Sequence, residues 1–165
     1  MKNIFFILLT TVVFYSCDSE TTPKKATNLQ TYINVNLKDH NSGENLLGTE
    51  NFPENIIRAD YLIGGKIVFN NNYAFNSDYP NNLYIVNEFN KHYVKVFLND
   101  DNTEAFPITY LHWNKTETDT IKVKYDRENG KFGISVTLEK VWVNNVLVWE
   151  VAKQGQSGSD ITIYK

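Results

Sequence analysis

Cysteine is almost absent from the sequence, because Cys17 is the only one among the 165 residues. A disulfide within the chain is therefore excluded, and the folded part must be stabilised by burial of apolar side chains. Arginine is also scarce, at Arg58 and Arg127 alone, and 19 acidic residues outnumber 16 basic ones. The resulting net charge of −3 disfavours nucleic acid and anionic lipid surfaces as partners.

Catalytic and cofactor motifs are missing as well. The three histidines lie far apart and lack the spacing of a zinc site. The Gly/Ser segment 155–158 is one residue too short for a nucleophile elbow. Tyr110 and His112 share one face of a predicted strand, but no partner for proton transfer is evident. These absences predict a protein that is not an enzyme and uses no cofactor or metal.

One short apolar run lies at the N-terminus. It covers residues 4–15, follows Lys2 and precedes Ser16 and Cys17. A positive start, an apolar core of about 7 to 15 residues and a small residue before the cleavage site are the parts of a secretory signal. A membrane-spanning helix needs about 20 apolar residues. We therefore expect residues 1–16 to be a cleaved signal peptide.

The motif Phe14-Tyr15-Ser16-Cys17 resembles the bacterial lipoprotein signal, with Phe14 where Leu is usual. The resemblance implies that Cys17 is lipidated and anchors the protein, since a diacylated cysteine carries the two chains that stable anchoring requires. Residues 17–28 would be the lipidated cysteine and a flexible tether that reaches at most about 35 to 40 Å. The alternative is an ordinary cleaved signal followed by an unmodified cysteine. The expected location is the cell envelope, at the outer membrane, on its periplasmic face or at the cell surface.

From residue 29 onward the dominant hydrophobic period is two, which predicts half-buried β-strands. The expected strands cover residues 29–38, 56–63, 66–70, 83–89, 92–99, 108–113, 120–126, 133–143, 146–151 and 160–164. Gly64-Gly65 and Asn144-Asn145 suit type I′ hairpin turns, and Asn90-Lys91 is a weaker third case. We predict one all-β domain over residues 29–165, an antiparallel β-sandwich of about nine strands, immunoglobulin-like or transthyretin-like.

Several strand and turn segments also resemble a class of small, uncharacterised lipoproteins of the Bacteroidetes type. These segments are residues 33–39, 45–48, 60–66 and 108–114. The resemblance implies a lipoprotein signal followed by a β-sandwich domain, and it supplies no catalytic residues.

The hairpin of residues 133–151 is the first candidate ligand-binding site, through Lys140, Trp142 and Trp149. With a two-residue turn at Asn144-Asn145, one hairpin face carries four valines and the other carries both tryptophans, Leu147 and the stem of Lys140. Without a bulge, Trp142 lies on the core face of the strand, on the same side as Ile134, Val136 and Leu138. A bulge near Lys140 would instead expose the tryptophans, with Lys140 over the Trp149 ring. Either face needs a cover, from the same domain or from a partner.

The second candidate is a polar, aromatic loop that contains Tyr73, Asn76, Asp78 and Tyr79. A glycan site needs a flat aromatic ring to stack on a sugar, together with fixed amides or carboxylates to bond its hydroxyls. The alternative is that the tyrosines fold back onto their own sheet with their hydroxyls in water.

Oxygen-rich segments at residues 39–45, 99–104 and 117–119 suit either calcium or tight turns. None has the register of an EF-hand, so we expect turns. Taken together, the sequence predicts a non-enzymatic binding or accessory module for a glycan or protein partner. The alternative is a purely structural envelope protein without a ligand site.

Overall fold

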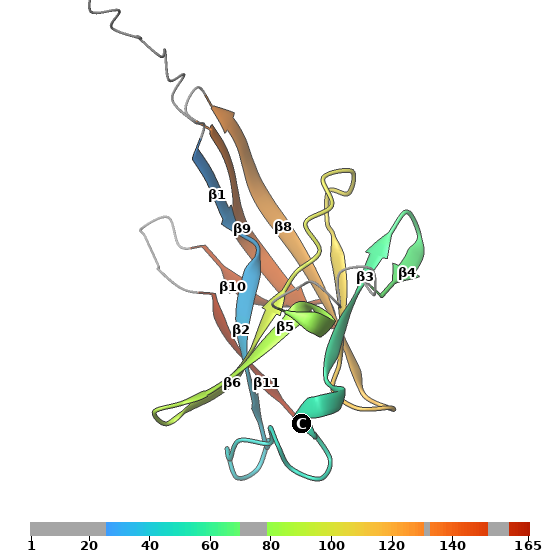
Figure 1. Ribbon diagram of the computed structural model, residues 1–165, viewed down its shortest axis with the longest axis vertical. Coiled ribbons are helices and arrows are strands. Elements are labelled where there is room, and N and C mark those ends of the chain that lie inside the picture. The colour runs from blue at the N-terminus through green and yellow to red at the C-terminus, as the bar shows by residue number, and fades with distance from the viewer. Residues whose placement is uncertain (1–25, 70–78, 131–132, 152–158) are drawn as a thin grey trace, which may run out of the picture.

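The computed structural model describes residues 26–69, 79–130, 133–151 and 159–165 and confirms the predicted all-β sandwich (Figure 1). Two 3₁₀ turns, η1 (Glu54–Ile56) and η2 (Pro80–Asn82), are the only helical elements in these ranges. The strands are β1 (Ala26–Gln30), β2 (Tyr32–Lys38), β3 (Arg58–Ile63), β4 (Lys66–Val68), β5 (Leu83–Glu88), β6 (Lys91–Phe97), β7 (Ile108–His112), β8 (Thr118–Gly130), β9 (Gly133–Val143), β10 (Val146–Glu150) and β11 (Asp160–Tyr164). β9 and β11 have the predicted bounds, and β8 is longer than predicted.

The described strands form two sheets, one of seven strands, called the long sheet, and one of four strands, called the short sheet. The long sheet has the order β1-β9-β8-β7-β3-β4, with β10 also paired to β9, and the short sheet has the order β11-β2-β6-β5. Two pairs are parallel, β1 with β9 and β11 with β2, whereas the other pairs are antiparallel. The prediction of an antiparallel sandwich of about nine strands is therefore corrected, since the described residues form a mixed sandwich of eleven strands. The chain passes from one sheet to the other at Thr31, and this splits the single strand predicted at 29–38 into β1 and β2.

The core lies between the two sheets and follows the period-two pattern. Ile33, Val35 and Leu37 of β2 have no exposed surface, and neither do Val123 and Val141 of the long sheet. Their polar neighbours point away from the core, as strand geometry requires. One apolar cluster joins the inner faces of both sheets, so burial stabilises the sandwich as a single unit.

A buried polar network fastens the end of the chain to the long sheet. Asp119 is only 2% exposed and accepts hydrogen bonds from the Trp113 indole at 2.6 Å and the Asn144 amide at 2.7 Å. The Lys165 ammonium lies 3.0 Å from the same carboxylate. Because a buried charge needs partners, Asp119 stabilises this junction only while they remain.

The hairpin turns follow the predicted chemistry in two cases out of three. Gly64-Gly65 and Asn144-Asn145 have positive φ at both positions, as type I′ turns require. The prediction for Asn90-Lys91 is wrong by one residue, because Glu88 pairs with Lys91 and the turn is Phe89-Asn90. A turn at Asn90-Lys91 would place Asn87 opposite the fully buried Val94, whereas the observed register pairs Val94 with Ile85.

The two ends of the sandwich carry different parts of the chain. β1 begins at Ala26, opposite Gly133 at the tip of the β8–β9 hairpin, so strand structure starts within the last three residues of the expected tether. The C-terminus and the 39–45 segment lie at the opposite end (Figure 1). Within the described ranges, no helix is long and apolar enough to cross a membrane.

Candidate functional site

The predicted alternative of a bulge near Lys140 is confirmed. Lys124 pairs with Lys140, but Tyr125 pairs with Leu138, so Glu139 is the extra residue in β9. Val136 and Leu138 face the core before the bulge, and Val141 and Val143 face it afterwards. The bulge therefore turns Trp142 to the outer face of the long sheet.

A second bulge, at Val148 in β10, separates the two tryptophans. Leu147 pairs with Trp142, whereas Trp149 pairs with the buried Val141. Trp149 packs against the core cluster and lines a small cavity of about 330 Å³ beside Gln30. The prediction that both tryptophans share one face is wrong, because each bulge changes the face of the residues that follow it.

Lys140 does not cover the Trp149 ring as expected. It forms an ion pair with Glu150 at 2.7 Å, and the hydrogen bond from Lys140 to Glu150 raises the pKa of the lysine above its ordinary value. The cation over an indole is instead Lys122, with its Nζ 5.1 Å from the Trp142 ring. Phe106 meets the same ring edge-on at 5.8 Å. Neither partner could be predicted from the sequence, because both become neighbours of Trp142 only through strand pairing and loop packing.

The second predicted site is described only in part. Tyr73, Asn76 and Asp78 lie outside the described residues. Tyr79 lies with its ring centroid 4.7 Å from that of Phe97 and 5.9 Å from that of Tyr84. All three rings are on the outer face of the short sheet, where β5 and β6 pair. Tyr79 therefore folds onto the sheet, and its ring remains 43% exposed.

The outer face of the short sheet also contains a polar groove of about 480 Å³. Its floor comes from β2, where burial of the alternate apolar residues turns Asn34, Asn36 and Lys38 outward. The full lining is Asn34, Asn36, Lys38, Gly43, Asn45, Asn90, Lys91, His92, Tyr93 and Asp160. The alternation of asparagine with buried residues at 33–37 was a signal for this floor, but the sequence did not show what surrounds it.

The groove forms where β2 and β6 separate. Their pairing ends at Val35 and Val94, and Asn45 then takes the place next to Lys38. The Asn45 amide donates a 2.6 Å hydrogen bond to the His92 carbonyl, so the side chain bridges the two strands. The His92 imidazole lies 2.6 Å from the Glu54 carboxylate, which fixes the same wall from behind. These contacts make the groove a preformed feature of the fold.

Asp39, beside the groove, and Asp101, in the loop that follows β6, both act as turn residues. The Asp39 carboxylate accepts hydrogen bonds from the backbone N–H groups of Ser42 and Asn41, at 2.7 and 2.9 Å, and these hold the pKa of Asp39 below its ordinary value. Asp101 caps its own turn through Thr103 in the same way. Among the described residues, no group of three or more His, Cys, Asp or Glu side chains could hold a metal ion.

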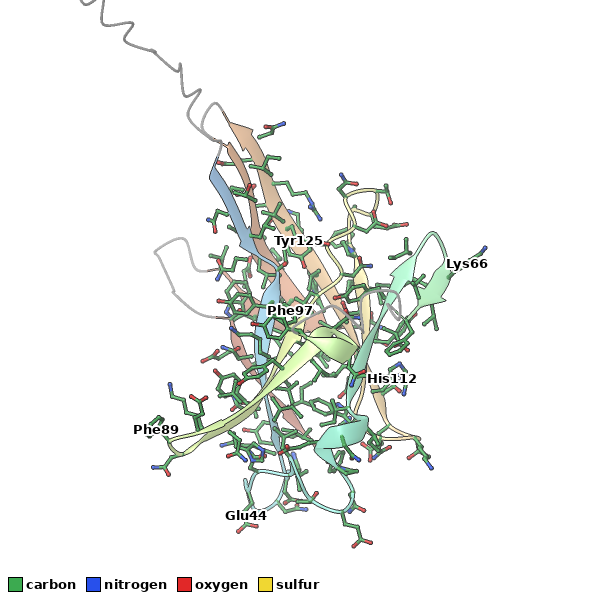
Figure 2. All side chains as sticks on the ribbon, in the orientation of Figure 1. Glu44, Lys66, Phe89, Phe97, His112 and Tyr125 are labelled. Atoms are coloured by element: carbon green, nitrogen blue, oxygen red, sulfur yellow. The ribbon has the colours of Figure 1, made fainter. Side chains whose placement is uncertain are left out.

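Phe89 is an unusual residue at the tip of the β5–β6 hairpin, which forms one wall of the groove. Its φ is 47°, in the left-handed region that bulky side chains avoid, and its ring is 95% exposed. Figure 2 shows the side chain at the tip, away from the body of the domain. The position is unfavourable for both backbone and side chain, and residues of this kind concentrate at functional sites.

His112 has a partner that the sequence did not reveal. Its Nε2 lies 2.9 Å from Oδ2 of Asp60, which is 5% exposed, and its Nδ1 lies 2.8 Å from the Thr118 hydroxyl. The Arg58 Nε lies 3.5 Å from the other oxygen of Asp60. This chain of contacts joins β3, β7 and β8 on the outer face of the long sheet. Its evident role is to hold these strands together around a buried carboxylate.

Comparison with protein-family models, with curated proteins and with solved structures finds no match. Cys17 lies outside the described residues.

Proposed function

We propose that the protein is a lipid-anchored module of the cell envelope that binds a glycan on the outer face of its short sheet, without enzymatic activity. The observation that carries the proposal is the polar groove, in which four asparagine side chains, one tyrosine and one carboxylate converge. Amides and carboxylates bond sugar hydroxyls from fixed positions, and an aromatic ring stacks on the apolar face of a sugar. The walls are already held by Asn45 and His92, which lowers the entropy cost of binding.

The position of the groove supports the same proposal. The tether expected after Cys17 leads into β1 at one end of the domain, whereas the groove lies toward the other end (Figure 1). From Ala26 to Lys38 the chain can span at most about 40 Å. A domain anchored through Cys17 would thus hold the groove away from the lipid surface, where a large glycan has access.

The lipid anchor has its own test. Cells that express the wild-type chain are expected to incorporate radiolabelled fatty acid into the protein, whereas Cys17→Ala should remove the label. A secreted, unlabelled wild-type protein would contradict the anchor and favour an ordinary cleaved signal. The glycan proposal does not depend on this result, because the groove belongs to the folded domain.

Glycan binding is tested by titrating the full chain, in detergent, with a panel of envelope and environmental oligosaccharides. We expect at least one glycan class to bind, and Asn36→Ala and Tyr93→Ala to weaken that binding at least tenfold while thermal unfolding shows that the domain remains folded. Lys66→Ala, on β4 of the other sheet, is the matched control and should bind normally. Absence of binding to the whole panel, with the domain folded, would refute the proposal and favour a purely structural protein.

A protein partner is the second candidate, and a separate surface favours it. On the outer face of the long sheet, Trp142 lies next to Phe106 and Leu147, which are each 46% exposed. Exposed apolar patches of this kind are typical of interaction sites. A photo-reactive side chain at position 147 should then capture one envelope protein in cells, and the same group at Lys66 should not.

A further inference from the structure

We infer that the groove selects an acidic glycan, one whose sugars carry carboxylate or sulfate groups. The inference rests on the proposed glycan binding and adds the chemical class of the ligand. It comes from the charges that line the groove, because their sign is opposite to that of the chain as a whole.

Two lysines supply the positive charge. Lys38 ends β2 and Lys91 begins β6, and both line the groove. Neither lysine forms an ion pair with any residue in the described part of the chain. The net charge of the whole chain is −3, so two unpaired cations beside one groove are a local reversal of sign.

The other charged groups of the lining are already engaged. Asp160, the one carboxylate among the lining residues, accepts a 2.7 Å hydrogen bond from the Asn34 amide. His92 lies 2.6 Å from Glu54, so any positive charge on its imidazole is balanced there. The hydrogen bond from a neutral amide leaves the charge of Asp160 in place, so the lining carries two ammonium groups against one carboxylate and is net positive.

The two lysines would also lie opposite each other if the pairing of β2 with β6 continued. β2 and β6 are antiparallel, with Asn34 opposite Lys95 and Val35 opposite Val94, and the same register continued would bring Lys38 opposite Lys91. The strands separate before that point, and Asn45 fills the space between them. Like charges on adjacent strands repel, and an anion bound between the ammonium groups relieves that repulsion.

Lysine suits an anionic sugar in particular. Its ammonium is a compact point charge on a flexible stem, so it pairs with a carboxylate or a sulfate without the fixed planar geometry that arginine imposes. The Asn36 amide donates one hydrogen bond to the Ile161 carbonyl at 3.3 Å, so its second N–H and its oxygen remain for neutral hydroxyls, together with the Asn90 amide. The Tyr93 ring remains for stacking. An acidic glycan is the ligand that uses all three kinds of group at once.

The test compares probes of one backbone with and without charge. The full chain in detergent is titrated with an oligogalacturonate, its neutral methyl ester, a sulfated galactan oligosaccharide and the same oligosaccharide after desulfation. We expect one acidic probe to bind at least tenfold more tightly than its neutral counterpart, and the acidic member that binds identifies the group. Lys38→Gln combined with Lys91→Gln should remove this preference, and so should high salt, because screening weakens exposed charge pairs. Lys66→Gln is the matched control and should preserve the preference.

The outcomes separate the two proposals. Equal binding of each acidic probe and its neutral counterpart would overturn the acidic selection and leave the glycan proposal standing. Binding of neither kind, by a chain whose melting curve shows a folded domain, would overturn both. Acid-selective binding that survives the double lysine substitution would overturn the assignment to this groove.

Discussion

The turn at Phe89-Asn90 allows a substitution that should stabilise the domain and weaken its binding at the same time. Phe89 has a φ of 47° and Asn90 has a φ of 69°, whereas the hairpin at Asn144-Asn145 has asparagine in both equivalent positions. A left-handed conformation costs a residue other than glycine about 1 to 2 kcal/mol, and asparagine tolerates it better than most residues. Phe89→Asn therefore removes most of this strain.

The loss of the aromatic ring costs little in return. Full burial of a phenylalanine side chain contributes about 1.5 to 3 kcal/mol, and the Phe89 ring is 95% exposed, so truncation forfeits only ~0.1 kcal/mol of burial. We expect a net gain of about 1 kcal/mol in the free energy of unfolding. For a domain of this size that gain corresponds to a rise of roughly 3 °C in melting temperature.

Urea and thermal unfolding of the full chain measure this gain directly. Phe89→Ala is the first control, because it removes the ring but keeps the strained φ, and we expect it to change stability by less than about 0.5 kcal/mol. Gly64→Ala is the reverse experiment at the equivalent turn position of another hairpin. Gly64 has a φ of 56° and a Cβ there would meet nothing within 4 Å, so a loss of stability would come from the backbone and not from a steric clash.

A decrease in stability for Phe89→Asn would refute this reasoning, since it would mean that the ring is packed in solution. The functional readout is separate. If Phe89 contacts the ligand at the rim of the groove, the stabilised variant should bind less tightly, which is the usual relation between strain and function at a binding site.

Three further predictions concern the fold. Asp119→Ala should lower the free energy of unfolding by about 3 to 5 kcal/mol in urea, because it leaves the buried donors of the network unpaired; a loss below about 1 kcal/mol would contradict the network. Burial raises the pKa of the Tyr61 and Tyr125 hydroxyls above the ordinary value of about 10. Their contribution to the free energy of unfolding is therefore complete below pH ~10 and is lost at higher pH, because the tyrosines of the unfolded chain ionise first. Alkaline titration should show their tyrosinate absorbance appearing only with unfolding, and early ionisation would argue against their burial. Trp149→Ala should cost about 2 to 4 kcal/mol, since this ring packs on the core, whereas Trp142→Ala on the outer face should cost less; an equal loss in thermal unfolding would contradict the separation of their faces.

The sequence predicted the strands well because each one repeats a local pattern. Alternation of apolar and polar residues marked β9 and β11 to the residue, and Gly64-Gly65 and Asn144-Asn145 marked two turns by their tolerance of positive φ. The bulges at Glu139 and Val148 could not be located in the same way. A bulge depends on which residue finds a partner on the neighbouring strand, and the sequence suggested only that one near Lys140 would reverse the hairpin.

The candidate site also combines local features, which the sequence predicts, with long-range contacts, which it does not. Period-two burial of Ile33, Val35 and Leu37 is a local property, and it alone turns Asn34 and Asn36 outward. The walls come from elsewhere: Asp160 meets Asn34 across 126 positions of the chain, and Asn45 reaches His92 across 47. Side-chain direction within a strand follows from neighbouring residues, so composition and order were sufficient for it. The groove, the pairing of parallel strands and the separation of Trp142 from Trp149 required long-range contacts, which only the folded chain decides.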